Sequence, residues 1–314
     1  MDRRNFLAMG SVAVAAGVSA VKAEGTAPSR PAPTPAGKLL TRRIPSSGEA
    51  LPAIGLGTSG PFEVGPDEAA RAPLREVLQG FFDAGATLID TSPMYSTAES
   101  VLGGLLTPDQ QSRVFMATKV WTPGSGSHGE QKGVEQMQRS MALLEHRRIE
   151  LMQVHNLVDV DAHLKTLRRW KAEGKIKYFG VTHYTTSSYP DLIAIIEREK
   201  PDFVQFNYSV STREAEKRLL PLCADKGVAV LVNRAFEDGN LFTQVQGRAL
   251  PAWAADFGAK SWAQVFLKFV LAHPAVTCVI PATGKLRNLL DNLGAATGPL
   301  PDAKQRAKIV RELG

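Results

Sequence analysis

The chain of 314 residues contains two cysteines, too few for a disulfide scaffold. Cys223 lies in a helical pattern and Cys278 in a strand pattern, so we expect each to be a small buried apolar residue. There is no C-x-x-C, and the six histidines show neither H-x-H nor H-E-x-x-H spacing. The sequence therefore predicts no metal site.

A continuous basic stripe with interleaved aromatic residues is also missing. The 37 Lys and Arg residues outnumber the 31 Asp and Glu residues by a formal charge of +6, and they are scattered between apolar segments. We therefore expect no nucleic-acid partner. A modest positive excess suits an anionic small molecule, although solubility alone explains it equally well.

The N-terminus has the layout of a twin-arginine signal, because Arg3 and Arg4 precede an uncharged stretch at residues 5–21. This stretch is short for a spanning helix, and small residues that suit cleavage follow it at Ala20 and Ala23. We expect a signal peptide that directs the chain to the twin-arginine export machinery, and so to the periplasm or another location outside the cytoplasm, and no stable membrane span in the mature chain. An uncleaved N-terminal anchor is the alternative.

The segments divide as follows. Residues 1–23 are the expected signal peptide, and residues 24–37, with four prolines, form a flexible tether. From residue 38 to residue 314, short apolar runs alternate with longer segments whose apolar residues recur at three and four. This alternation predicts repeated βα units and a parallel sheet.

Eight strand candidates share β-branched or apolar character: residues 51–58, 86–91, 113–121, 149–156, 176–183, 202–209, 228–236 and 276–282. Helical stripes fall between them at residues 134–144, 160–170 and 262–270, and Gly174 ends the second stripe. Eight pairs in roughly 250 residues predict an α/β fold of the (β/α)8 TIM-barrel type. A doubly wound sheet is the alternative, but no G-x-G-x-x-G follows the first strand.

Residues 38–52 contain Ser-Ser-Gly between two extended runs, which predicts a small hairpin that closes the bottom of the barrel.

Polar side chains stand where three consecutive strand candidates end. Asp90 ends the second, Lys119 lies near the end of the third and His155 near the end of the fourth, while Tyr95 follows in the loop after Asp90. Because neighbouring strands are about 4.8 Å apart, groups at the same height on successive strands converge. Singly, each residue has a structural explanation such as a cap, an exposed strand end or packing. Jointly they predict an active site.

The chemistry of these residues suits proton transfer to a carbonyl. A phenol has a reference pKa of about 10, and an ammonium nearby favours phenolate. Lys119 supplies that charge, Asp90 is its counter-ion, and His155 adds a hydrogen-bond donor for a carbonyl oxygen. Tyr95 is then a general acid without a nucleophile or metal, so a hydride source is the missing reactant.

Ordered motifs between residues 42 and 297 resemble the aldo/keto reductase family: LPAIGLGT, LIDTSPMY with Glu99 and Gly103 behind it, ATKVW, MQVHN, GKIKYFGVTH, DFVQFNYS and VIPATGKLRNLLDN. The resemblance implies reduction of an aldehyde or ketone with NADPH, or alternatively NADH. It implies Tyr95 as proton donor, Lys119 and Asp90 as its tuning pair and His155 as the carbonyl-orienting residue. Trp121 is placed like a substrate-pocket aromatic, with a buried structural tryptophan as the alternative.

The resemblance also implies cofactor contacts along the barrel mouth. Thr182, His183 and Gln205 stand where the family has Ser, Asn and Gln at the nicotinamide carboxamide, and Asn233 replaces a stacking aromatic ring. Arg234 either reaches the pyrophosphate or pairs with Glu237 or Asp238. Further positions expected at the adenosine end are Thr283, Lys285, Arg287, Asn288, Asp291 and Asn292. Ala282 departs from the family pattern, where a lysine often meets the 2′-phosphate.

Two other functions compete with carbonyl reduction. A redox-sensing or structural module could hold a dinucleotide without turnover, as some barrel relatives do, but such a binder has no need for a tuned phenol. A TIM-barrel hydrolase would need a metal cluster that the sequence does not predict.

Overall fold

A computed structural model describes residues 37–122 and 129–313 of the chain. The expected signal peptide and all but the last residue of the expected tether lie outside the described residues. No helix in the described part is both long and apolar enough to cross a membrane.

Eight parallel strands form one sheet that curls on itself. They follow the chain as β3 (Leu56–Gly57), β4 (Leu88–Asp90), β5 (Phe115–Val120), β6 (Ile149–His155), β7 (Ile176–Thr182), β8 (Phe203–Asn207), β9 (Ala229–Asn233) and β10 (Val276–Val279). Each strand pairs with its neighbour in sequence, and parallel bridges at Ile54–Val279 and Gly57–Ala282 join the first to the last. The predicted α/β fold with a parallel sheet is confirmed.

The first strand candidate, residues 51–58, is divided between two sheets, which corrects its prediction as one strand. Its start belongs to β2 (Ala50–Pro52), which pairs antiparallel with β1 (Thr41–Arg43). Its end belongs to β3 in the barrel. Gly55 immediately precedes β3, and a Cβ on it would lie 2.7 Å from the carbonyl oxygen of Leu88 on β4. Glycine therefore permits the chain to approach β4 closely at this point.

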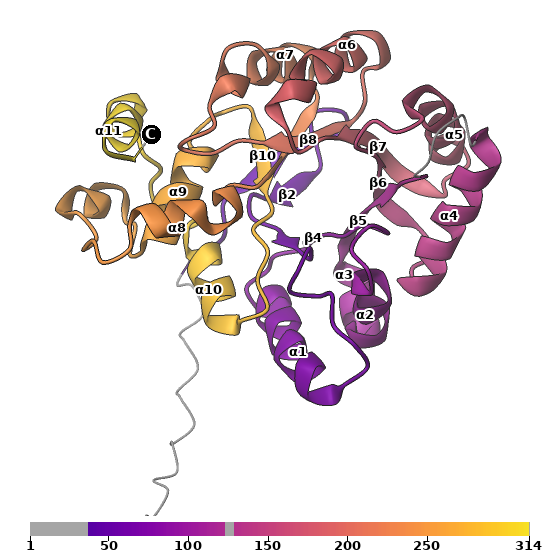
Figure 1. Cartoon of the computed structure of the whole chain (residues 1–314), viewed down its shortest axis with the longest axis horizontal. Coiled ribbons are helices and arrows are strands. Elements are labelled where there is room, and N and C mark those ends of the chain that lie inside the picture. Colours follow the sequence, from indigo (N-terminus) through magenta and orange to yellow (C-terminus); the bar gives the residue numbers. More distant parts are fainter. Residues whose placement is uncertain (1–36, 123–128, 314) are drawn as a thin grey trace, which may run out of the picture. The chain divides into compact units, whose positions relative to one another are not determined.

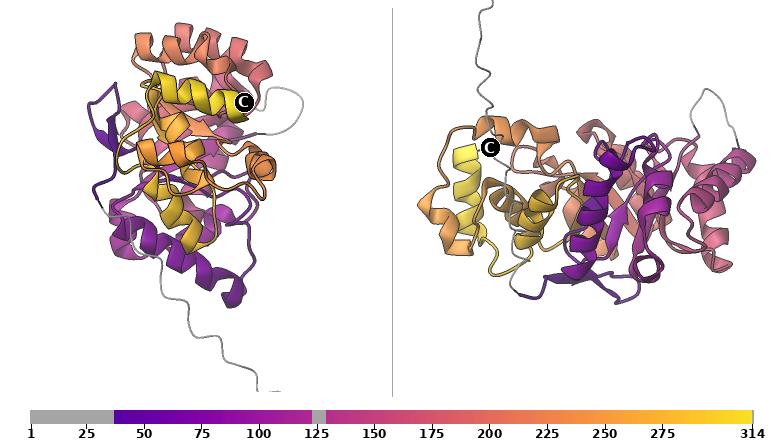
Figure 2. Two further views of the ribbon diagram at one scale, coloured as in Figure 1. Left: turned by 90° about the vertical axis from the view of Figure 1, so that its left-hand side faces the viewer. Right: turned by 90° about the horizontal axis from the view of Figure 1, so that it is seen from below.

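The expected N-terminal hairpin is present as β1 and β2, and Figure 2 shows it at one end of the barrel in both views. Ile44 and Leu51 of the hairpin pack with interior residues such as Phe115 and Leu151, near the starts of their strands. The hydroxyl of Tyr178 on β7 donates to Ser47 in the turn at 2.6 Å. The hairpin thus contacts the amino ends of the strands, and its closing of that end stays a prediction.

Helices lie outside the ring of strands (Figure 1). They are α1 (Glu68–Asp83), α2 (Ala98–Leu105), α3 (Pro108–Arg113), α4 (Gly129–Leu143), α5 (Val160–Ala172), α6 (Tyr189–Glu199), α7 (Leu219–Lys226), α8 (Asn240–Gln244), α9 (Trp262–Leu271), α10 (Leu286–Gly294) and α11 (Ala303–Leu313). Short 3-10 turns occur at Thr186–Ser188, Glu214–Glu216, Glu237–Gly239 and Ala252–Phe257.

Local sequence explains where several helices begin and end. Thr107 and Gln110 form a reciprocal capping box at the start of α3, and the Ser261 side chain accepts from the Gln264 backbone at the start of α9. Gly227 follows α7 in the left-handed region at φ 67°, where a side chain would be strained. The three predicted helical stripes lie in α4, α5 and α9, except that Leu144, the last residue of the first stripe, follows the end of α4.

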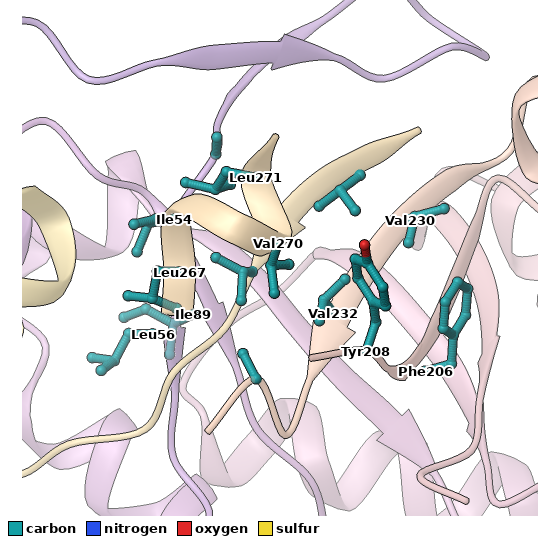
Figure 3. Close-up of a cluster of buried hydrophobic side chains, with 14 of the residues drawn as sticks. Ile54, Leu56, Ile89, Phe206, Tyr208, Val230, Val232, Leu267, Val270 and Leu271 are labelled. Atoms are coloured by element: carbon teal, nitrogen blue, oxygen red, sulfur yellow. The ribbon is translucent and has the colours of Figure 1, made fainter. Parts of the chain in front are cut away.

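Two apolar clusters hold the barrel together. One fills its interior, and the other lies between the sheet and the helices, where Val230 and Val232 of β9 and Leu267 and Val270 of α9 belong to a single group of buried side chains (Figure 3). Each of these side chains contributes about 1.5–3 kcal/mol by burial.

Both cysteines are buried and free, as the sequence analysis predicted. Burial raises the pKa of Cys223 to about 12 and raises that of Cys278 further, so both stay as thiols.

Candidate active site

A cavity of about 780 Å³ opens at the carboxyl ends of the strands. Its lining includes the last residues of five strands: Gly57 of β3, Asp90 of β4, His155 of β6, Thr182 of β7 and Asn233 of β9. Tyr95, from the loop after β4, also lines it. A site at this end is where a parallel barrel presents residues from several loops to one ligand.

Asp90 and Lys119 form a buried ion pair beneath this cavity. Lys119 Nζ donates to Asp90 Oδ1 at 2.7 Å and to the Thr91 carbonyl oxygen at 2.7 Å. Burial by itself lowers the pKa of Lys119, but the Asp90 carboxylate and the Tyr95 phenol outweigh it and raise that pKa. The lysine therefore keeps its charge, although its side chain is fully buried.

Tyr95 lies against this ion pair, with Lys119 Nζ 5.1 Å from its ring centroid. The net pKa of Tyr95 is raised above 10.0, chiefly by burial, while Lys119 lowers it and Asp90 raises it again. This corrects the expectation that Lys119 brings the phenol pKa down. The lysine acts in the predicted direction, but desolvation of the phenolate outweighs it.

His155 faces Tyr95 edge to face, with ring centroids 6.0 Å apart. Its Nδ1 lies 2.8 Å from the Ser92 hydroxyl oxygen. Burial, with Lys119 and His183 adding repulsion, lowers the pKa of His155 to about 2. The ring is therefore neutral at physiological pH and can orient a ligand by a hydrogen bond without carrying charge.

A network of amide side chains extends the site from Asp90 towards β9. Gln205 Nε2 donates to Asp90 Oδ2 at 2.9 Å, and Gln153 Nε2 approaches the same oxygen at 3.3 Å. Gln205 Oε1 accepts from Thr182 Oγ1 at 3.0 Å and from Asn233 Nδ2 at 3.3 Å. Two expected nicotinamide contacts, Thr182 and Gln205, are thus hydrogen-bonded to each other, and Gln205 is also hydrogen-bonded to Asp90 of the ion pair.

Other predicted residues lie at or beyond the cavity rim. His183 Nδ1 accepts from the Thr185 backbone at 3.2 Å, and its ring stacks on Tyr184. Arg234 lines the cavity and forms an ion pair with Asp238, one of the two carboxylates that were predicted as its alternative partners. Trp121 is not among the cavity-lining residues that the structure describes; its backbone N–H donates to the Gln136 side chain at 3.0 Å.

The residues expected at the adenosine end gather at the start and along α10, which packs beside α1 (Figure 1). Lys285 is its N-cap residue and is exposed, whereas Asp291 accepts from Gln264 Nε2 at 2.8 Å. None of the set lines the cavity within the described part of the chain: Thr283, Lys285, Arg287, Asn288, Asp291 and Asn292.

Two polar residues of the site were missed from sequence. Ser92 contacts His155 and Gln153 contacts Asp90, both through fully buried side chains. Strand alternation was an available signal for Gln153, which precedes His155 by two residues and so shares its face of β6. For Ser92 no such signal existed, because its contact depends on the path of the loop after β4.

Comparison with known proteins places these features in one family. The model of the aldo/keto reductase family matches residues 53–310. Methylglyoxal reductase YeaE of Escherichia coli (strain K12) is 26% identical over 269 residues, covering 84% of this chain and 92% of that protein. Probable aldo-keto reductase 1 of Glycine max is 26% identical over 304 residues, covering 81% and 86%.

Solved structures share the fold. An aldo/keto reductase from Klebsiella pneumoniae in complex with NADP and acetate has a TM-score of 0.67 at 23% identity, covering 85% of this chain and 93% of that chain. The holo form of an aldo-keto reductase from Bacillus halodurans has a TM-score of 0.71 at 20% identity, covering 88% and 97%. Since the family model spans all eight strands and the whole polar cluster, this chain belongs to the aldo/keto reductase family.

Proposed function

We propose that the enzyme reduces an aldehyde or ketone by hydride transfer from NADPH, with Tyr95 as the general acid. The observation that carries this proposal is the buried Asp90–Lys119 pair with the Tyr95 ring 5.1 Å from its ammonium, at the edge of the cavity. Burying an ammonium costs free energy, which suggests that its charge serves the reaction. Here the charge of Lys119 can stabilise the phenolate that forms when Tyr95 loses its proton.

The residues at the cavity suit a nicotinamide dinucleotide at one end. Asn233 Oδ1 is a buried acceptor with no partner among the described residues, and the Thr182 hydroxyl keeps acceptor capacity after donating to Gln205. Both fit the amide donor of a nicotinamide carboxamide. For the phosphate-bearing end of the dinucleotide, beyond the cavity, the first turn of α10 offers backbone N–H groups without helical acceptors. These groups lie next to Lys285 and suit a phosphate.

The bound dinucleotide would supply the hydride to the carbonyl carbon. Tyr95 gives its phenolic proton to the carbonyl oxygen, which becomes the alcohol hydroxyl. Lys119 stabilises the phenolate left behind, and Asp90 keeps the lysine charged. His155 is not the acid, because its pKa of about 2 leaves the ring without an imidazolium proton at neutral pH; the neutral ring orients the carbonyl oxygen instead.

Loss of the phenol tests the assignment of Tyr95. Tyr95→Phe should reduce kcat by about 10²-fold or more while the Kd for NADPH stays within about twofold. Methylglyoxal, the substrate in the name of the Escherichia coli relative, and benzaldehyde are suitable first probes. If the wild-type protein binds NADPH but oxidises it with no carbonyl in a broad panel, a dinucleotide-binding module without turnover replaces the enzyme.

We also propose that the chain is exported through the twin-arginine machinery to the periplasm. The proposal is supported by Arg3 and Arg4 ahead of the uncharged residues 5–21. Replacing both arginines by lysine keeps the charge and should retain the protein in the cytoplasm, as fractionation would show. Unchanged secretion of the double variant would rule this route out.

A further inference from the structure

Ser92 makes two hydrogen bonds in the loop after β4. Its hydroxyl oxygen lies 2.8 Å from His155 Nδ1, and it accepts from the Met94 backbone N–H at 3.1 Å. The Ser92 side chain is fully buried, so water does not reach it. Its hydroxyl proton must therefore find an acceptor in the protein.

The direction of the Ser92–His155 hydrogen bond follows from counting donors and acceptors. Within residues 37–122 and 129–313, His155 Nδ1 is the one acceptor that the Ser92 hydroxyl meets. If Nδ1 carried the imidazole proton instead, Ser92 would accept twice and its own proton would be buried without a partner. Such an unpaired donor costs free energy, so the bond runs from the Ser92 hydroxyl to Nδ1.

We infer that Ser92 is a positioning residue that holds His155 in the tautomer with its proton on Nε2. Because His155 lines the cavity and Nδ1 is occupied, Nε2–H is the donor that remains for a ligand. A carbonyl oxygen needs a donor there, whereas the other tautomer would present a lone pair and repel it. This consequence for catalysis rests on the proposed carbonyl reduction; the tautomer itself does not.

The tautomer can be measured without substrate. The full chain is labelled with ¹⁵N at its six histidines, and His155 is assigned by the resonances that vanish in His155→Gln. In the wild-type protein we expect Nε2 to resonate as a protonated nitrogen and Nδ1 as an unprotonated one. The reverse pattern, or an averaged pair of resonances, would overturn the inference.

Ser92→Ala removes the hydroxyl and tests its role. We expect the two nitrogen resonances of His155 to move towards each other, as both tautomers become populated. Ser140→Ala is the matched control, because it removes another buried serine hydroxyl, one that donates to Glu99 at 2.9 Å. It should leave both His155 resonances in place. Resonances that stay unchanged in Ser92→Ala count against the positioning role.

Kinetics then separate the inference from the proposed function. With benzaldehyde and NADPH, Ser92→Ala should lower kcat/KM about tenfold or more and leave the Kd for NADPH unchanged. If Ser92→Ala shifts the tautomer but the wild-type protein reduces no carbonyl, the proposed function fails and the positioning role stands. If the wild-type enzyme is active and Ser92→Ala changes neither its resonances nor its rate, the positioning role fails alone.

Discussion

The Tyr95 phenol is under opposing influences that together decide when it can give a proton. Burial raises its pKa, the Lys119 ammonium lowers it, and the Asp90 carboxylate raises it again. The net pKa lies above 10.0, so Tyr95 is fully protonated at neutral pH. A general acid for reduction must be protonated before the reaction, and this balance keeps it so.

The pH dependence of reduction follows from these directions. The active form has Tyr95 protonated, so the raised pKa of Tyr95 moves the loss of enzyme activity to higher pH. We expect kcat/KM to be flat from about pH 6 to about pH 9 and to fall only beyond it, since His155 with a pKa of about 2 does not titrate in that window. Circular dichroism at each pH checks that the fold persists. A break near neutrality would mean that another group controls the reaction.

Removing one charge of the buried Asp90–Lys119 pair should cost more stability than removing both. Asp90→Asn leaves the fully buried ammonium of Lys119 without its counter-ion, so we expect a loss of about 3–5 kcal/mol in the free energy of unfolding. Asp90→Asn combined with Lys119→Met removes both charges and should recover most of that loss. Urea denaturation measures the stabilities. A double variant as unstable as the single one would show that charge pairing is not the cause.

At the scale of elements, helix α2 is fixed against α4 by a glycine. A Cβ on Gly103 would overlap the carbonyl oxygen of Leu143 at the end of α4. A hydrogen bond also joins α2 to β5: Thr118, the residue before Lys119, donates to the buried carboxylate of Glu99 on α2 at 2.6 Å. Glu99 therefore ties α2 to β5, the strand that carries Lys119, and α4 packs against both elements.

Adjacent glycines in α2 offer a matched pair of substitutions. Gly103→Ala should destabilise the fold by about 1–3 kcal/mol, because backbone atoms cannot move aside as a flexible side chain can. At Gly104 a Cβ would meet nothing nearer than Arg71 Nη1 at 4.0 Å, so Gly104→Ala should stabilise the helix by about 0.5–1 kcal/mol. Equal effects on the melting temperature would contradict the close approach.

At the scale of the whole molecule, cofactor binding should stabilise the barrel. A ligand at about 100 times its Kd adds about 2.7 kcal/mol to the free energy of unfolding, which corresponds to a rise in Tm of roughly 5–10 °C. We expect a larger shift with NADPH than with NADH at equal concentration. Arg287 is an exposed cation in the first turn of α10, at the expected adenosine end, where it would meet the 2′-phosphate that NADPH has and NADH lacks. Arg287→Gln should therefore reduce the NADPH shift and leave the NADH shift unchanged, with Lys304→Gln, an exposed cation on α11, as the control. A greater shift with NADH would reverse the cofactor preference.

Local pattern was enough to determine the fold class and the helical stripes. The apolar segments at 86–91, 113–121 and 149–156 predicted successive strands. The period and length of an apolar pattern depend only on residues that are neighbours in the sequence, so the pattern can be read without the structure. Because parallel strands present their carboxyl ends together, the same pattern placed Asp90, Lys119 and His155 at one end of the barrel. The N-terminal signal is likewise a property of the sequence, and it stays a prediction.

Only the tertiary structure decided the properties that depend on burial and on long-range contact. The raised pKa of Tyr95 reflects desolvation, which no spacing reveals. The division of residues 51–58 between two sheets depends on which partner each half meets. The contact of Ser92 with His155, 63 positions away, arises where the loop after β4 meets the end of β6, so only folding brings the two together.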